Sequence, residues 1–333
     1  MLRTARPVFS RSFLISLVSA WLAIVAAALV YRHIYPADRW LLTAALPACL
    51  LESAFYLGAT FQRTREWFSH AFTPLTQALL LWISSLLPYL TFALFSGTFH
   101  GNAFVLLATL SGLFSFWYAV SPRRLPYDIG FLVIAAAPLL AHAFKRIYIS
   151  PDPQIAIALL GPLMWIRDGI TALLSQRGWD PGEFSLWPKP REWRLGLLYY
   201  ALVLVPLCMV GIALGDVQFE PLRKSPLTVV AFAVGTFFGI LWVVALSEEL
   251  FFRGFVARAL LKCGYQPVVA VLLSAVLFGC AHLWFHAFPN WRRAIVAAVL
   301  GLGCGFVYLR TQSVRAPMVT HALAVTTWRL FFR

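Results

Sequence analysis

The stretch ALSEELFFRGF, residues 245–255, determines how this sequence is to be interpreted. It lies inside an apolar segment near 227–262, yet it places Glu248, Glu249 and Arg253 within six positions. A charged side chain in the middle of a bilayer costs roughly 2.5–3.5 kcal/mol on insertion scales. Ionisable groups at that depth are therefore functional candidates, and the stretch predicts a polar site inside a membrane-embedded helix.

The composition extends this interpretation to the whole chain. Of 333 residues, 61% are hydrophobic and 12% are charged, whereas a soluble domain carries about 25% charged residues. Apolar segments, broken by charges, proline and glycine, lie near 12–31, 41–59, 75–95, 103–120, 128–143, 154–174, 194–215, 227–262, 267–286, 291–309 and 315–331. We expect the first to be a transmembrane helix. The predicted fold class is an all-α, polytopic transmembrane bundle of about 10–11 membrane helices.

The charge pattern indicates which partners to expect. The formal charge of +14 comes from 27 Lys and Arg against 13 Asp and Glu. The basic residues lie in small groups between the apolar segments, a pattern typical of topology signals and of contact with anionic headgroups. The lipid bilayer is therefore an expected partner, and nucleic acid is not.

Helical geometry separates the two glutamates. Glu249 and Arg253 lie four residues apart with the acid first, which is the favourable order for an ion pair. Glu248 points about 100° away, toward apolar neighbours. Desolvation and a like-charged neighbour both favour proton binding by a carboxylate, which suits a general base near neutral pH. We therefore expect Glu248 to be the base and Glu249 to be neutralised by Arg253.

Two histidines in later segments are candidate partners of Glu248. A turn around Tyr265 follows the glutamate helix, and Glu248 and His282 lie 17 residues to either side of Tyr265. At about 1.5 Å per residue, an antiparallel pair would place both groups about 25 Å from the turn, at one depth. Phe278 is expected to support the His282 ring. His321 matches this depth only to within about 10 Å on straight helices, so helix tilt would have to close the gap.

Taken in order, these residues resemble a known family. EELFFR (248–253) fits the motif EExxxR, FGCAH (278–282) fits FxxxH, and APMVTHALAV (316–325) resembles a final histidine segment. Together they resemble the CPBP group of intramembrane glutamic proteases, which is related to the type II CAAX prenyl endopeptidase and to bacterial lysostaphin-resistance proteins. The resemblance covers roughly residues 190–333.

The resemblance implies an endopeptidase that hydrolyses a peptide bond in a membrane-anchored protein or peptide substrate. It makes Glu248 the base and gives Glu249 and Arg253 a role in shaping the site. It makes His282 and His321 groups that orient water or stabilise the developing oxyanion.

Three alternatives stay open. The family often has Asn or Asp four residues after the last histidine, where this chain has Val325. Losing one oxyanion donor can cost about 10²–10³ in rate, so Val325 favours a catalytically inactive CPBP-like protein. Intramembrane carboxylates and histidines also occur in proton-coupled transporters, although the sequence shows no two related halves.

Zinc is the third alternative. His282 and His286 lie four residues apart, like half of a zinc site to which Glu248 could add a ligand. A set of Glu248, His282 and His321 is the other arrangement. We expect no metal and no cofactor, because His286 would lie about 6 Å nearer the membrane surface than His282.

The motifs divide the chain into two regions. We expect residues 1–150 to be an accessory transmembrane region and residues 151–333 to be the catalytic domain. Residues 167–194, rich in charges, Gly, Pro and Trp, are interpreted as a membrane-surface segment. Glu52 has no evident explanation. Most Lys and Arg fall on the side of the amino terminus, which predicts a cytoplasmic amino terminus in the cytoplasmic membrane of a bacterium.

Overall fold

The computed structural model describes residues 9–34, 38–150, 152, 157–285 and 288–332. Within them, nine helices are long and apolar enough to cross a membrane. One shorter apolar helix, Leu125–Leu140, and the 17-residue helix Arg315–Phe331 account for the remaining predicted segments. The protein is an integral membrane protein, and its predicted all-α, polytopic fold is confirmed.

The chain divides into two compact units, residues 1–179 and 180–333. This division falls later in the chain than the boundary expected near residue 150. The roles assigned to residues 1–150 and 151–333 stay predictions.

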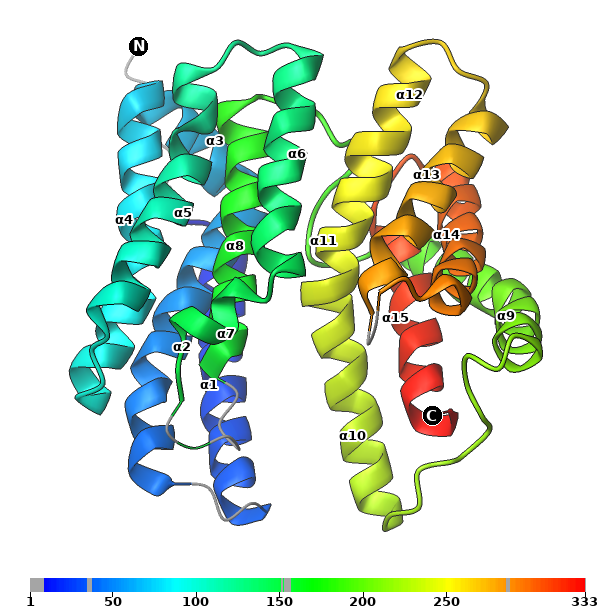
Figure 1. The fold of residues 1–333 in the computed structure, drawn as a ribbon, viewed down its shortest axis with the longest axis horizontal. Helices are drawn as coiled ribbons and strands as arrows, with labels where there is room; N and C mark the ends of the chain where they lie inside the picture. The colour runs from blue at the N-terminus through cyan, green and yellow to red at the C-terminus, as the bar shows by residue number, and fades with distance from the viewer. Residues whose placement is uncertain (1–8, 35–37, 151, 153–156, 286–287, 333) are drawn as a thin grey trace. The chain divides into compact units, whose positions relative to one another are not determined.

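The amino-terminal unit is built from helices whose ends follow from local sequence. Asp38 caps α2 by accepting from the backbone N–H of Trp40, and Thr73 caps α4 in the same way. Helices α2, α4 and α8 pack on one another (Figure 1). The helices of this unit are α1 (Arg11–Ile34), α2 (Arg39–Thr60), α3 (Gln62–Ala71), α4 (Pro74–Ser96), α5 (Gly101–Val120), α6 (Leu125–Leu140), α7 (Ala143–Ile147) and α8 (Leu160–Thr171), which continues as a π-helical turn (Ala172–Gln176).

The prediction of a surface segment over 167–194 is wrong for its first part. Residues 167–176 are helical, and Arg167 and Asp168 are 2% and 0% exposed. The reason is an ion pair across 115 positions, because Arg167 Nε donates to Glu52 Oε1 at 3.0 Å. The charges that suggest a membrane surface are thus partners of the unexplained Glu52.

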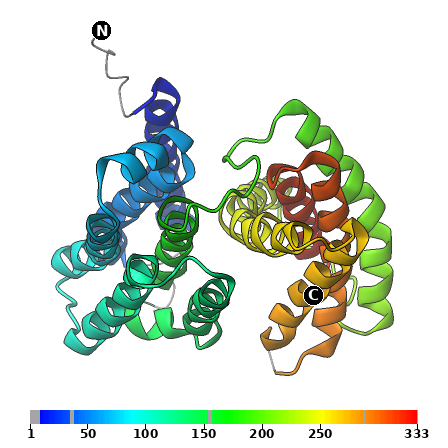
Figure 2. The same cartoon turned by 90° about the horizontal axis from the view of Figure 1, so that it is seen from above.

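The carboxy-terminal unit surrounds its last helix. Figures 1 and 2 show α15 enclosed by the other helices of this unit, and it packs against α9, α10, α11 and α14. The helices of this unit are α9 (Pro190–Ala213), α10 (Pro226–Gly239), α11 (Leu246–Glu249), α12 (Arg258–Lys262), α13 (Pro267–Ala281), α14 (Trp291–Thr311) and α15 (Arg315–Phe331). Between α10 and α12 the chain is one continuous helix, Pro226–Lys262.

Two glycines allow the close helix contacts that hold α15 and α14 in place. A Cβ atom at Gly196 would lie 2.6 Å from Cβ of Val319, so α9 and α15 touch through backbone here. The Thr320 hydroxyl donates to the Gly196 carbonyl at 2.9 Å. A Cβ atom at Gly301 would lie 3.1 Å from the backbone of α13. The contacts at Gly196 fix α15 one and two residues before His321, and the contact at Gly301 holds α14 against α13.

Candidate functional site

The two glutamates occupy a single α-helical turn, α11, between two π-helical segments at Ile240–Ala245 and Leu250–Ala257. Short π-helical insertions widen a helix and occur frequently at functional sites. The Glu248 side chain is 30% exposed, whereas that of Glu249 is fully buried. The different surroundings that helical geometry predicts for the two carboxylates are therefore present.

Glu249 is neutralised inside the unit. Arg253 Nη1 lies 3.0 Å from Glu249 Oε2, and both side chains are 0% exposed, so the predicted ion pair is confirmed. Arg253 Nη2 also donates to the Gly301 carbonyl at 2.8 Å. The guanidinium lies 4.9 Å from the centre of the Phe278 ring. A buried charge that is paired and hydrogen-bonded in this way can persist at low dielectric.

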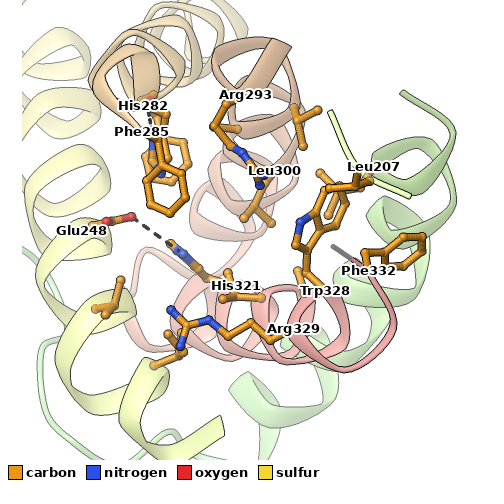
Figure 3. Close-up of a pocket in the computed structure, with 18 residues that line it drawn as sticks. Leu207, Glu248, His282, Phe285, Arg293, Leu300, His321, Trp328, Arg329 and Phe332 are labelled. Atoms are coloured by element: carbon orange, nitrogen blue, oxygen red, sulfur yellow. Dashed lines mark hydrogen bonds and ion pairs between the residues drawn. The ribbon is translucent and has the colours of Figure 1, made fainter. Parts of the chain in front are cut away.

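His321 lies next to both glutamates, and Figure 3 shows its pairing with Glu248. Its Nδ1 lies 2.8 Å from Glu249 Oε1, and its Nε2 lies 3.7 Å from Glu248 Oε2. Because Glu249 is a carboxylate that also accepts from Arg253, Nδ1 carries the hydrogen of the shorter contact. The other nitrogen, Nε2, faces Glu248 across a distance longer than a direct hydrogen bond. Packing of α15 therefore closes the gap that straight helices would leave.

His282 lies where α13 ends, in a short 3-10 turn, His282–Trp284. Its Nδ1 lies 2.9 Å from the Phe278 carbonyl, which accepts the hydrogen and leaves Nε2 for other contacts. The Phe278 ring lies 4.7 Å from the His282 ring and 5.7 Å, edge to face, from the His321 ring. The Phe278 ring thus supports both imidazoles. Its support of the His282 ring is expected from the sequence.

A cavity of about 430 Å³ brings the polar groups together. Glu248, His282 and His321 all line it, and Figure 3 shows Glu248 and His321 facing each other across it. Most of the other lining side chains are apolar, including Val325, one turn beyond His321. A mostly apolar cavity with a few convergent polar groups is typical of a binding site. His286 lies outside the described residues.

Two arginines in the cavity wall, Arg293 and Arg329, are not identified by the sequence pattern. Arg293 pairs with Asp216 at 3.3 Å and lies over the rings of Phe285 and Trp328 at 5.3 and 5.6 Å. In the sequence, these arginines resemble ordinary topology signals at the ends of apolar segments. Their place in the wall depends on how α14 and α15 pack.

Potential metal ligands occur in two overlapping sets. Atoms of Glu249, Cys304 and His321 lie within 4.8 Å of one another, but Glu249 already bonds His321 and pairs with Arg253, whose positive charge disfavours a cation there. In the alternative set named from the sequence, Glu248, His282 and His321, His321 Nε2 lies 3.7 Å from Glu248 Oε2, and His282 could contribute only Nε2. Among the described residues, Glu249, Cys304 and His321 are the group whose potential ligand atoms lie this close together, and the set of Glu248, His282 and His321 does not form such a group.

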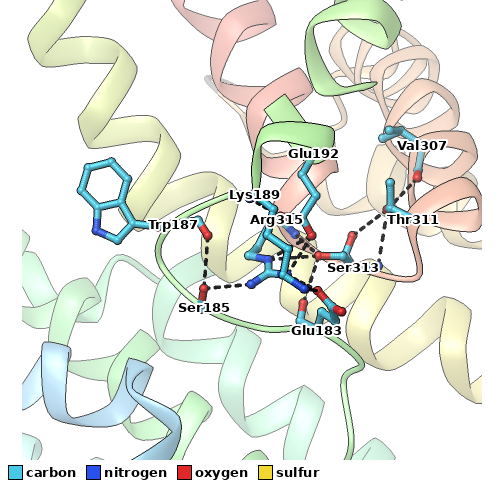
Figure 4. A network of polar contacts seen from close by, with 9 residues as sticks. All are labelled: Glu183, Ser185, Trp187, Lys189, Glu192, Val307, Thr311, Ser313 and Arg315. Carbon is cyan, nitrogen blue, oxygen red and sulfur yellow. Dashed lines mark hydrogen bonds and ion pairs between the residues drawn. The ribbon is translucent and has the colours of Figure 1, made fainter. Parts of the chain in front are cut away.

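A polar network fixes the start of α15 (Figure 4). Arg315 Nη2 lies 2.9 Å from Glu192 Oε1 and also pairs with Glu183. The Lys189 ammonium, 2.6 Å away, and Arg315 hold the pKa of Glu183 below its ordinary value. The charged residues of the network are Glu183, Lys189, Glu192 and Arg315. It ties the segment before α9 to the helix that carries His321.

Comparison with known proteins gives one finding. Residues 230–327 match the family model described as type II CAAX prenyl endopeptidase Rce1-like. The match extends from α10 into α15 and includes Glu248, Glu249, Arg253, His282 and His321. It confirms the resemblance to the CPBP group and relates this part of the chain to membrane-embedded proteases of the CAAX type. No curated protein and no solved structure matches the chain.

Proposed function

We propose that the protein is an intramembrane endopeptidase that hydrolyses a peptide bond in a membrane-anchored protein or peptide, with Glu248 as the general base. One observation carries the proposal. Of the two adjacent carboxylates, Glu248 reaches the cavity and faces His321 Nε2, while Glu249 is bound to Arg253 and His321 Nδ1. Glu248 is thus the carboxylate that can react, and the adjacent Glu249 holds His321 in place.

The four ionisable groups of the site can balance one another's charge. With His321 as an imidazolium, Glu248, Glu249, Arg253 and His321 sum to zero charge, which limits the cost of burying them. The imidazolium donates through Nδ1 to Glu249 and through Nε2 toward Glu248. A substrate water beside both Glu248 and His321 fits their separation of 3.7 Å.

The reaction then proceeds in two steps. Glu248 takes a proton from the water while the water oxygen attacks the carbonyl carbon, giving a tetrahedral intermediate with a negative oxygen. His321 Nε2–H or His282 stabilises that oxygen, since Val325 offers no donor. The C–N bond then breaks as Glu248 passes its proton to the leaving nitrogen. A carboxylic acid and an amine result, and Glu248 is again a carboxylate.

We further propose that no metal is required, with a zinc ion on Glu248, His282 and His321 as the alternative. A zinc-bound water would be acidified by the ion itself, which would remove the need for a separate base. The amino terminus is proposed to lie in the cytoplasm, and residues 1–150 to be accessory to the catalytic region.

The test is a comparison of protein termini in membranes that contain the wild type or Glu248→Gln. Termini in or near membrane segments should be present with the wild type and lost with Glu248→Gln. Glu66→Gln, on the amphipathic helix α3, is the control and should keep them. If a folded, membrane-inserted wild type produces no termini that depend on Glu248, the protein is the inactive CPBP-like form that Val325 favours.

A further inference from the structure

The amino-terminal unit holds a second buried charged cluster, which the proposed function does not use. Glu52 on α2, Ser84 and Ser85 on α4, and Arg167 and Asp168 on α8 form what we call the amino-terminal cluster. Arg167 Nε donates to Glu52 Oε1 at 3.0 Å, and Arg167 Nη1 donates to Ser84 Oγ at 2.6 Å. Arg167 Nη2 lies 3.3 Å from Asp168 Oδ1. The cluster joins three helices at a depth where charge is costly.

The Ser85 hydroxyl makes two short contacts with oxygen atoms, and these contacts need one hydrogen more than the hydroxyl itself can donate. Ser85 Oγ lies 2.7 Å from the Leu81 carbonyl and also 2.7 Å from Asp168 Oδ2. Both are acceptors if Asp168 is ionised, but a hydroxyl has one hydrogen to donate. A carbonyl carries none, so the second hydrogen can come only from a protonated Asp168 Oδ2. Ser84 has no such conflict, because it accepts from Arg167 and donates to Leu81.

The charge count points the same way. With both acids ionised, Glu52, Asp168 and Arg167 sum to a net negative charge, although their exposed fractions are 0%, 0% and 2%. An uncompensated buried charge is strongly unfavourable. A proton on one carboxyl group removes it. Glu52 is the less suitable holder, because its Oε1 directly accepts from Arg167.

A buried tyrosine supplies a second, independent observation. Tyr148 is 1% exposed, and its hydroxyl has no hydrogen-bond partner within the described part of the chain. It interacts electrostatically with Glu52, Arg167 and Asp168. Glu52 Oε2 and Asp168 Oδ1 are likewise without a hydrogen bond to any described residue. The cluster therefore has buried hydrogen-bonding atoms that no described residue satisfies.

We propose that the amino-terminal cluster is a proton-binding site, in which Asp168 holds a proton on Oδ2 and donates it to Ser85 Oγ. Glu52 stays ionised against Arg167, and the cluster is neutral. Loss of the proton leaves one negative charge between α4 and α8 and removes the hydrogen bond from Asp168 Oδ2 to Ser85 Oγ. A rise in pH should therefore destabilise the amino-terminal unit.

The thiol and phenol groups that face Glu52 and Asp168 add no charge at neutral pH. On α2, Cys49 and Tyr56 interact with Glu52. Tyr148 follows α7, and Tyr89 of α4 interacts with it. Thiols and phenols are ordinarily uncharged at neutral pH, so Arg167 is the one cation that faces the two carboxyl groups among these neighbours.

Two isosteric variants of the full-length protein in detergent test the assignment. Asp168→Asn mimics the protonated acid and should shift Tm by less than about 3 °C, while Glu52→Gln removes the carboxylate that accepts from Arg167 Nε and should lower Tm by about 10 °C or more. The matched control is Asp128→Asn in the same unit. Asp128 accepts two hydrogen bonds from Arg177, at 2.8 and 3.1 Å, as an ionised acid does, so its amide should destabilise.

Infrared spectroscopy locates the proton. The carbonyl band of a protonated carboxyl group should be present at pH 7, lost in Asp168→Asn and kept in Asp128→Asn. The contribution of Asp168 to the Tm of the wild type should fall as pH rises above about 4, the ordinary pKa of an aspartic acid, until the folded protein has lost the proton, and Asp168→Asn should remove that component. If the band vanishes in Glu52→Gln instead, or if the two amide variants Asp168→Asn and Glu52→Gln destabilise equally with no band in the wild type, the proposal is overturned.

Discussion

Each unit contains a cluster of two carboxylates and one arginine, yet the two clusters differ in two respects. In the carboxy-terminal unit, Glu248 opens onto a cavity, and His321 adds a fourth group that can carry positive charge. In the amino-terminal cluster, both Glu52 and Asp168 are fully buried, and its partners include no histidine among the described residues. Similar charged groups can thus form a reactive site or a closed joint between helices.

The difference shows which features matter for catalysis. A buried ion pair occurs in both clusters, so the pair alone does not indicate activity. The features confined to the carboxy-terminal site are a carboxylate that reaches a cavity, an imidazole oriented by a second carboxylate, and a further histidine in the wall.

The largest effect is expected for Glu249→Ala. It leaves Arg253 unpaired in a fully buried position and removes the partner of His321 Nδ1. We expect a loss of about 3–5 kcal/mol in the free energy of unfolding, as for other broken buried pairs, together with loss of cleavage. Thermal unfolding in detergent measures the first effect. Equal stability of Glu249→Ala and Glu248→Ala would contradict the different roles of the two carboxylates.

Val325→Asn should act in the opposite direction, on rate. Val325 lines the cavity one turn beyond His321, so an amide there could donate to the developing oxyanion. Single donors of this kind are worth about 10²–10³ in rate, and we expect a gain of at least about tenfold in kcat. Val325→Leu is the apolar control and should not gain. A slower Val325→Asn enzyme with unchanged folding would show that the oxyanion lies elsewhere.

The surface charges should show a smaller effect, confined to acid pH. The backbone N–H of Gly182 and the Arg258 guanidinium lower the pKa of Asp180, and Lys189 and Arg315 lower that of Glu183. A carboxylate with a lowered pKa in the folded protein stabilises it above its unfolded pKa, and that stability is lost as pH falls through the folded value. The wild type should therefore lose Tm in acid, and Asp180→Asn with Glu183→Gln should lose less. An identical acid profile would contradict this.

The smallest effect, none, is expected from metal removal. If Glu248 activates water, cleavage in detergent should survive EDTA and o-phenanthroline, and the purified protein should contain well under one zinc per chain. Stoichiometric zinc that leaves together with activity, and restores activity when added back, would replace Glu248 by a metal as the activating group. The carboxy-terminal site would then differ from the amino-terminal cluster by a bound zinc ion.

Local and regular features of the site could be predicted from the sequence. The Glu249–Arg253 pair follows from a spacing of four within one helix, and the shared cavity of Glu248 and His282 follows from their equal distance to Tyr265. The apolar segments likewise gave the helices. These predictions depend on helix rise and on a single turn, which the sequence specifies directly.

The parts that the sequence could not supply depend on packing between distant segments. His321 meets Glu249 across 72 positions because α15 packs closely on α9 at Gly196. Glu52 meets Arg167 across 115 positions, and charges beside a short apolar run are otherwise typical of a membrane surface. No spacing rule connects residues so far apart, so these pairings required the structure.

The most direct test of the comparison places Glu248→Gln and Asp168→Asn side by side. Both changes replace one buried or half-buried acid, next to a paired one, by its amide, and both keep the shape of the side chain. The terminus comparison in membranes, with Tm in detergent measured in parallel, should show cleavage lost in Glu248→Gln and kept in Asp168→Asn, with both proteins folded. Cleavage that persists in Glu248→Gln would contradict the assignment of Glu248 as the base.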